Sequence, residues 1–265
     1  MPDESKGLLI VVPCFHESAR LPSFLDDLCR QGPPSSDVSI LVVDDGSSPD
    51  EWERLQRLVM EKRLVYPQVR EPVRLSQNIG KGGTVYAGWS KHNGEEWLAF
   101  VDADGSCPAE AVRRLSELAL RQESNADALF ASRVLMLGRD VERKWSRHLI
   151  GRVYATLVSE LLKIPVYDSQ CGLKFVRRSA FESIRDRLQI TGFAFDVELL
   201  TLLLDAGYVI QEHPIDWHEV AGGKVHLVRD SIRMLRDVLR IKKSRGEACH
   251  KDASGIALDK NRDHS

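Results

Sequence analysis

Short apolar runs alternate with amphipathic segments along the first part of the chain. Four runs have the length and the β-branched composition of buried strands: "LLIVV" at 8–12, "VSILVV" at 38–43, "LAFV" at 98–101 and "ALFA" at 128–131. Helical spacing is found in the segments that separate them: 18–31, 50–63, and the residues after Asn78 and after Pro108. Strands that are apolar throughout and alternate with helices indicate a parallel sheet covered on both faces. We therefore predict an α/β fold with a doubly wound, mostly parallel sheet and helices on both of its faces.

In the second half of the chain the alternation weakens and longer helices are expected. They cover 145–163, 194–206 and 225–243, and "YDSQCGLKFVRRSAF" lies between the first two. The segment 244–265 is polar, and we expect it to be a disordered tail. The sequence thus predicts a single domain over residues 1–243.

The composition is that of a globular protein and excludes several classes. The chain has 265 residues, 43% of them hydrophobic, and its net charge of -2 gives no support to nucleic-acid binding. Five scattered cysteines without CxxC spacing indicate neither a disulfide framework nor a zinc site. The acidic N-terminus does not resemble a secretory signal, and no uncharged run reaches the roughly 18 residues that a membrane span needs. We expect a cytoplasmic protein that, where a membrane is involved, lies peripherally on its cytoplasmic face.

Polar clusters follow three of the predicted strands. They are "PCFHE" at 13–17, "DDGSS" at 44–48 and "DADGS" at 102–106. Because ligands of doubly wound sheets bind beyond the carboxyl ends of the strands, these clusters predict a binding site. No GxGxxG follows the first strand, which argues against a dinucleotide-binding fold.

The third cluster carries two carboxylates, Asp102 and Asp104, immediately before Gly105. Side chains at i and i+2 of an extended chain point to the same side, so the two carboxylates could converge on one point. Like charges that converge need a cation or a shared proton between them. Carboxylate oxygens suit Mg²⁺ or Mn²⁺ better than zinc, so we expect a metal that binds together with a diphosphate. The alternative is a solvated turn capped by aspartates.

Basic residues indicate a site for anions. Lys81 lies at a predicted helix start, among three glycines, where backbone N–H groups favour an anion; packing is the other explanation for these glycines. The segment 132–152 is rich in arginine, which matches a site for an anion or a solvated helix surface.

Eight motifs, in this order, resemble inverting family 2 glycosyltransferases that act on polyprenyl phosphates: "VVPCFHE", "ILVVDDGS", "NIGKGG", "FVDADG", "ASR", "DSQCGLKF", "FAFDVELL" and "IDWHEVAGGKVHL". The likeness covers about residues 8–243. It is strongest to the members that transfer glucose to dolichyl phosphate, and next to those that transfer mannose. One departure is Phe15-His16, where the family usually shows Tyr-Asn.

The resemblance implies a GT-A fold with Mg²⁺ or Mn²⁺ as cofactor. It also implies a nucleotide-sugar-binding half over 8–140 and an acceptor-binding half over 141–243. The matching donor-side positions are Pro13, Phe15, Glu17 and Asp45 for the nucleoside, Lys81 and Gly82 lining its site, and Asp102 and Asp104 for the metal and diphosphate. Arg133, together with Arg147 or Arg152, matches the position that contacts the acceptor phosphate. Asp168 and Gln170 match positions near the sugar, and Lys224 matches a position near the phosphates.

The function that the resemblance implies is hexosyl transfer, foremost of glucose from UDP-glucose, to a polyprenyl phosphate. Transfer of mannose or another hexose, from a GDP- or UDP-sugar, is the nearest alternative. A nucleotidyltransferase, recognised by pyrophosphate release, and a non-catalytic nucleotide-sugar binding module remain open as well.

Two predictions concern the last helices. Asp196 suits the start of its helix, and Glu198, within an apolar segment, is expected to face the active site. Over 225–243, apolar residues and arginines recur side by side with helical spacing: Val228, Ile232, Leu235 and Leu239, then Arg229, Arg233, Arg236 and Arg240. Such a helix either lies at an anionic membrane surface or packs its apolar stripe on the domain.

Overall fold

The computed structural model describes residues 7–31, 37–121, 125–133, 141–142, 158, 160–164, 168–218, 220 and 232–245. The main sheet has seven strands in the order β3-β2-β1-β4-β7-β5-β8. Their bounds are Leu8–Cys14 (β1), Val38–Asp44 (β2), Val73–Arg74 (β3), Trp97–Val101 (β4), Ala128–Ser132 (β5), Leu173–Arg177 (β7) and Ile210–Pro214 (β8). A second, two-stranded sheet pairs Val141–Glu142 (β6) with Trp217–His218 (β9).

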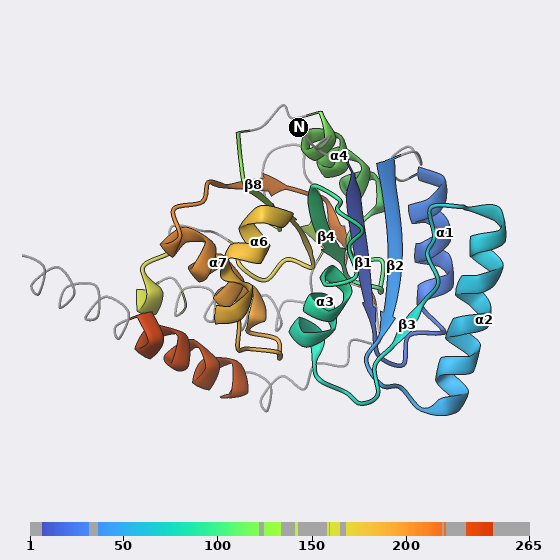
Figure 1. Ribbon diagram of the computed structural model, residues 1–265, viewed down its shortest axis with the longest axis horizontal. Coiled ribbons are helices and arrows are strands. Elements are labelled where there is room, and N and C mark those ends of the chain that lie inside the picture. The colour runs from blue at the N-terminus through green and yellow to red at the C-terminus, as the bar shows by residue number, and fades with distance from the viewer. Residues whose placement is uncertain are drawn as a thin grey trace, which may run out of the picture.

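Helices connect the strands and cover the main sheet (Figure 1). Their bounds are Leu21–Gln31 (α1), Pro49–Val65 (α2), Lys81–Trp89 (α3), Ala109–Leu120 (α4), Arg178–Ile184 (α6) and Phe195–Asp205 (α7). A 3₁₀ turn, η2, spans Arg185–Arg187. Residues 232–245 form a further helix, which runs two residues past the predicted domain end; the rest of the predicted tail lies outside the described residues.

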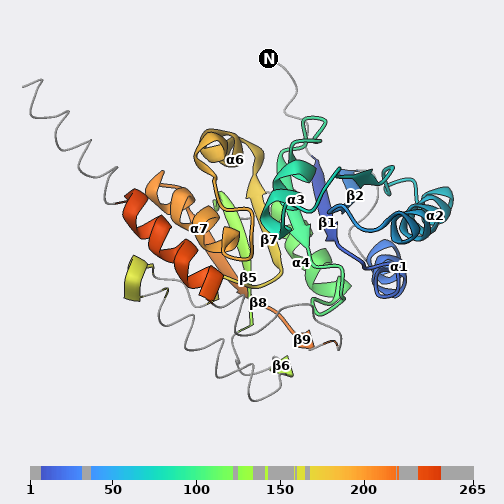
Figure 2. The same ribbon diagram turned by 90° about the horizontal axis from the view of Figure 1, so that it is seen from below.

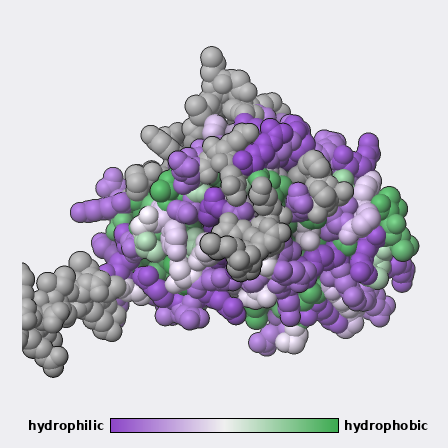
Figure 3. Space-filling model, turned by 45° about the horizontal axis from the view of Figure 1, so that its top comes forward, coloured by the Kyte–Doolittle hydropathy of each residue, from purple (hydrophilic) through white to green (hydrophobic). Residues whose placement is uncertain are grey.

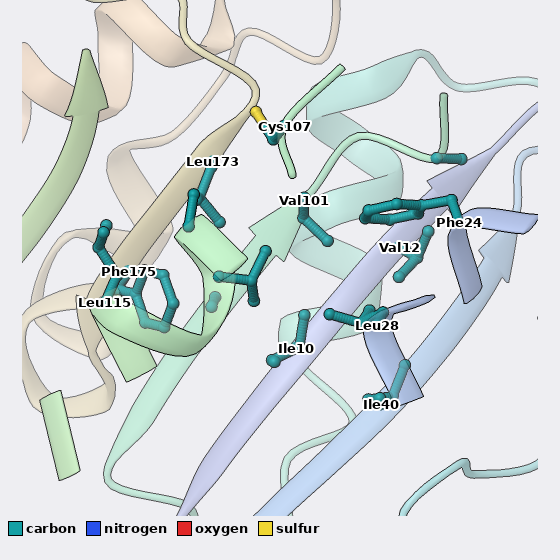
Figure 4. Close-up of a cluster of buried hydrophobic side chains, with 14 of the residues drawn as sticks. Ile10, Val12, Phe24, Leu28, Ile40, Val101, Cys107, Leu115, Leu173 and Phe175 are labelled. Carbon is teal, nitrogen blue, oxygen red and sulfur yellow. The ribbon is translucent and has the colours of Figure 1, made fainter. Parts of the chain in front are cut away.

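Helices lie on both faces of the main sheet (Figure 2), and a buried apolar cluster lies on each face. On one face α1, α2 and α4 contribute Leu25, Leu55 and Leu115 to a cluster that also contains Ile10 and Phe175. Figure 4 shows part of this cluster, including Ile10, Ile40 and Phe175 from three strands of the sheet. The other face is covered by α3, α6, α7 and the helix at 232–245. Buried side chains of these four helices contribute to a second cluster. The doubly wound fold predicted from the sequence is confirmed.

The predicted apolar runs are the strands β1, β2, β4 and β5, and five predicted helices correspond to α1, α2, α3, α4 and α7. Of the helix predicted over 145–163, only residues 158 and 160–163 are described, and residues 158 and 160–162 are helical. The strands β3, β7 and β8 were not predicted. Among the described strands of the main sheet, β7 alone is antiparallel to its neighbours, β4 and β5.

The insertion of β7 next to β4 brings two distant motifs together. Val101, the last residue of β4, is opposite Leu173, the first residue of β7. The N–H of Asp102 then donates to the carbonyl of Gly172 over 2.9 Å. The "DADG" turn and the "QCG" turn are therefore adjacent at the carboxyl end of β4.

No helix in the described part of the chain is long and apolar enough to cross a lipid bilayer. Hydrophilic residues predominate on the face drawn in Figure 3, where hydrophobic residues form small separate patches.

Candidate active site

The three polar clusters predicted from the sequence lie together beyond the ends of β1, β2 and β4. The N–H of His16 donates to Ser47 Oγ over 2.9 Å, and the N–H of Asp45 donates to the carbonyl of Cys14 over 2.8 Å. The hydroxyl of Ser47 in turn donates to the buried carboxylate of Asp44. These hydrogen bonds connect the loop after β1 to the loop after β2.

Asp102 is confined by Gly172 on one side and by Lys81 on the other. A methyl group on Gly172 would lie 2.1 Å from Asp102 Oδ2, so only glycine leaves space for this carboxylate. Lys81 Nζ lies 2.7 Å from Asp102 Oδ1. Burial alone would lower the pKa of Lys81, but Asp102 and Asp196 outweigh it and raise the pKa to about 12. Lys81 is therefore a permanent positive charge beside the acidic pair.

Asp104 lies in the turn that follows. Its Oδ1 accepts from the N–H of Ser106 over 3.0 Å, and the turn depends on the positive φ of Gly105, +75°. Its Oδ2 lies 4.0 Å from Arg20 Nη1. The basic side chains Lys81 and Arg20 thus lie beside the acidic pair in the described structure. Arg20 was not predicted as a site residue, because nothing in the sequence links it to residue 104.

The acidic pair fits a hard divalent cation that takes further ligands from its substrate. Asp102 and Asp104 are partly exposed, and their carboxylate oxygens are the donors that Mg²⁺ or Mn²⁺ prefers. Within the described residues, no group of three or more His, Cys, Asp or Glu side chains could hold a metal ion. The two carboxylates would therefore need diphosphate or water oxygens to complete the coordination.

Several residues predicted for the nucleoside have protein contacts here. The carboxylate of Asp45 accepts from the N–H groups of Ile79 and Gly80, over 2.7 and 2.9 Å, and so fixes the loop before α3. Pro13 is half-buried at the end of β1, and Phe15 is 37% exposed, in edge contact with the His16 ring. Glu17 is buried and binds Arg20.

Gly82 has a packing role in this structure. A methyl group at this position would lie 2.4 Å from the Cβ atom of Phe195, so Gly82 lets α3 approach the start of α7. Of the two explanations that the sequence left open for these glycines, the contacts of Gly82 favour packing.

Arg133, at the end of β5, forms a bidentate ion pair with Asp168. Arg133 Nε and Nη2 lie 2.7 and 2.8 Å from the two carboxylate oxygens, and the backbone N–H of Arg133 donates to the same carboxylate. Burial alone would raise the pKa of Asp168, but Arg133 holds it at about 2. The N–H of Gln170 also donates to Asp168, over 3.3 Å. The structure thus brings Arg133, Asp168 and Gln170 together; Arg147, Arg152 and Lys224 lie outside the described residues.

A buried ion pair below the acidic residues was missed from the sequence. Lys174 on β7 and Asp196 on α7 are 0% and 2% exposed, and Lys174 Nζ lies 2.8 Å from Asp196 Oδ1. Lys174 also donates to the carbonyl of Cys171, which is buried as well. The signal in the sequence was a charged residue inside each of two apolar runs, "LKFV" and "FDVELL".

Glu198, which we expected to face the active site, binds backbone groups in this structure. Its Oε2 accepts from the backbone N–H groups of Gln189 and Ile190, over 3.0 and 2.8 Å. Glu198 therefore fixes the loop before α7, a structural role that satisfies two backbone donors.

This fold and this acidic edge define a class of protein. The chain has the fold of glucosyl-3-phosphoglycerate synthase from Mycobacterium tuberculosis, solved in complex with Mg²⁺ and UDP: the TM-score is 0.65, with 15% identity, over 89% of this chain and 79% of that one. The TarS 1-349 structure from S. aureus, in complex with UDP-GlcNAc, gives a TM-score of 0.58 with 15% identity, over 89% of this chain and 66% of that one. The fold is the GT-A fold of glycosyltransferases.

Sequence comparison identifies the family. The model of "Glycosyl transferase family 2" matches residues 9–185. A dolichyl-phosphate beta-glucosyltransferase of Saccharomyces cerevisiae is 32% identical over 91% of this chain and 75% of its own length. The protein of the same name from Dictyostelium discoideum is 31% identical, again over 91% and 75%. The chain belongs to glycosyl transferase family 2 and is a glycosyltransferase, as its motifs predicted.

Proposed function

We propose that the protein transfers glucose from UDP-glucose to a polyprenyl phosphate of the dolichyl type, in a metal-dependent reaction that inverts the anomeric carbon. The observation that carries this proposal is the similarity, over about nine tenths of the chain, to enzymes named for that transfer. The solved neighbours with bound UDP or UDP-sugar share the fold and support a nucleotide-sugar donor.

The proposed donor site is the edge formed by Asp102, Asp104 and Lys81. Asp102 and Asp104 would hold Mg²⁺ or Mn²⁺, which supplies neutralisation of the negative charge on the leaving diphosphate. Lys81, charged at all physiological pH values, is placed to add a second positive charge at the start of α3. Pro13 and Phe15 remain our proposal for the nucleoside, and Asp45 and Glu17 would act there by holding the surrounding loops.

The proposed acceptor site lies around the Arg133–Asp168 pair. A lipid phosphate brings its own nucleophilic oxygen, so these residues need only bind and orient it. Because the Asp168 carboxylate accepts hydrogen bonds from two nitrogens of Arg133, we propose that these two residues act together in binding the phosphate. Gln170, which also binds Asp168, would lie beside the sugar. Arg147, Arg152 and Lys224 would complete the phosphate contacts.

One incubation tests donor, acceptor and metal together. The protein is mixed with polyprenyl phosphate and with either radiolabelled UDP-glucose or radiolabelled GDP-mannose, and label in the organic phase is counted. We expect label from UDP-glucose, loss of transfer in EDTA, and its return with Mn²⁺ or Mg²⁺. Label from GDP-mannose alone would instead identify a mannosyltransferase. Pyrophosphate release from a nucleoside triphosphate would instead identify a nucleotidyltransferase. Binding of the donor without any turnover would identify a non-catalytic binding module.

The helix at 232–245 is our proposal for contact with a membrane. Val238 and Ile241 are buried against the domain, whereas Ile232 and Leu239, which the packing alternative placed against the domain, are each 50% exposed. On a helix of 3.6 residues per turn, Ile232, Leu239 and Arg236 lie on the face opposite the buried one. An outward face that mixes apolar and cationic side chains suits an anionic lipid surface. Val228 and Arg229 lie outside the described residues.

Liposome flotation tests this face. A variant with Arg233, Arg236 and Arg240 changed to Gln should lose most of its binding to anionic vesicles, while the wild type floats in a salt-sensitive way. The control changes the same number of exposed arginines on α2 to Gln: Arg54, Arg57 and Arg63. Equal flotation of both variants would mean that the helix at 232–245 has only a structural role.

A further inference from the structure

Arg20 belongs to a loop that the structure fixes firmly beside the acidic pair. The loop connects β1 to α1, and the N–H and hydroxyl of Ser18 donate to the carboxylate of Glu51 on α2, over 2.8 and 2.9 Å. The N–H groups of Arg20 and Leu21 both donate to the carbonyl of Glu17. The backbone of Arg20 therefore has a fixed position.

The guanidinium of Arg20 is held by Glu17 through two of its three nitrogens. Nε lies 2.7 Å from Glu17 Oε2, and Nη2 lies 2.5 Å from Oε1. The Glu17 residue is only 7% exposed. This fork geometry fixes the plane of the guanidinium, and hence the direction of the third nitrogen, Nη1.

Nη1 is buried and, within the described residues, has no hydrogen-bond partner. Its nearby acceptor is Asp104 Oδ2, at 4.0 Å, which is beyond hydrogen-bond range. A buried N–H donor without a partner is unfavourable, so a small movement of Asp104 towards Nη1 would be stabilising. Nη1 is shielded from solvent, and the Asp104 carboxylate is the acidic group that lies near it among the described ion pairs.

Packing below the turn keeps the two groups close. Phe24 follows Arg20 by one helical turn, and its side chain lies 3.6 Å from the position that a methyl group on Gly105 would take. Figure 4 shows Phe24 reaching from α1 into the same cluster as Val101 and Cys107. The start of α1 and the "DADG" turn therefore form one packed unit.

We propose that Arg20 is a positioning residue for Asp104: Glu17 orients the guanidinium, and Nη1 donates to Asp104 Oδ2 when this carboxylate binds the metal of the donor complex. Carboxylates that bind metals are themselves held by hydrogen bonds, and loss of such a partner typically weakens metal binding about 10–100-fold. The inference rests on the proposed metal-dependent donor site. It also assigns Glu17 to the support of the metal site.

Binding of Mn²⁺ with UDP, without any turnover, provides the test. The EPR signal of free Mn²⁺ is followed during titration at saturating UDP, and binding of UDP alone is measured by calorimetry. Arg20→Lys keeps the charge but loses the planar fork that binds both oxygens of Glu17 and directs Nη1 towards Asp104, and we expect it to weaken Mn²⁺ binding about tenfold. Binding of UDP without metal and the melting temperature should stay close to wild type. The control is Arg113→Lys, which changes a surface arginine that is likewise paired with a glutamate three residues away, Glu110.

Three results would overturn the inference. Unchanged Mn²⁺ binding in Arg20→Lys would remove the positioning role. Tighter Mn²⁺ binding in Arg20→Gln would mean that Arg20 competes with the metal for Asp104. A parallel loss of metal-free UDP binding would assign Arg20 to the nucleoside loop in general. If the wild type itself binds no Mn²⁺ with UDP, the proposed donor site fails together with the inference, whereas a failure confined to the variants leaves that site standing.

Discussion

Asp104→Asn should reduce glycosyl transfer about a thousandfold, or roughly 4 kcal/mol of transition-state stabilisation, if Asp104 holds the metal of the donor complex. The amide keeps the size of the side chain, and its oxygen can still accept from the N–H of Ser106, so the turn should persist. Initial rates with labelled UDP-glucose and polyprenyl phosphate measure the effect, and thermal melting confirms the fold.

Asp104 is a better position for this test than Asp102. Asp102 is the partner of Lys81, at 2.7 Å, so its replacement would also strand a largely buried ammonium group. Asp26→Asn is the matched control, since Asp26 pairs with Lys62 on the surface, away from the strand ends. Near-wild-type transfer by Asp104→Asn would show that Asp104 does not bind the metal, and an equal loss in the control would show that the effect is not specific to Asp104.

The parts of the fold that were predicted from the sequence are those governed by local pattern. The strands β1, β2, β4 and β5 are buried on both faces, so their apolar runs, interrupted only by Ser39 in β2, can be recognised without knowledge of their neighbours. The positions of the three polar clusters followed from the rule that ligands bind beyond the strand ends.

The missed parts depend on contacts between distant residues. The strand β7 contains the buried residue Lys174. The burial of Lys174 is explained by Asp196, which follows 22 residues later in the chain, because Asp196 Oδ1 lies 2.8 Å from Lys174 Nζ. A charged residue inside a short apolar run argues against a buried strand as long as the residue that neutralises the charge is unknown. Arg20 is a similar case, because Asp104 comes near it only through the packing of α1 against the "DADG" turn.

The resemblance to a known family assigned roles to more residues than the sequence pattern did alone, but it did not give the contacts of those residues. It placed Glu17, Asp45 and Gly82 around the nucleoside, whereas the structure gives each a supporting contact: Glu17 with Arg20, Asp45 with the loop before α3, and Gly82 with Phe195. Residues that shape a site and residues that touch its ligand can therefore occupy the same motif, and only the three-dimensional contacts separate them.

Gly172→Ala should abolish most of the transfer activity without changing any charged residue. The added methyl group would lie 2.1 Å from Asp102 Oδ2, and the backbone of Gly172 cannot retreat easily because its carbonyl accepts from the N–H of Asp102. Asp102 must then move by about 1 Å or more, and a displacement of this size can cost about a hundredfold in rate. We expect Mn²⁺ binding in the presence of UDP to weaken in parallel, because the same carboxylate is displaced.

The backbone conformation at position 172 does not require glycine, so the Gly172→Ala substitution tests the contact with Asp102 alone. Gly172 does not have a positive φ, so alanine causes no backbone strain and its effect comes from the contact with Asp102. Gly192→Ala is the matched control, because its φ is also not positive and the nearest atom to its added methyl group, Asp237 Oδ2, is 4.0 Å away. The control should keep wild-type transfer and metal binding. If Gly172→Ala transfers glucose at the control's rate, the position of Asp102 against the "QCG" turn does not matter for the reaction, and the link between these two motifs is only structural.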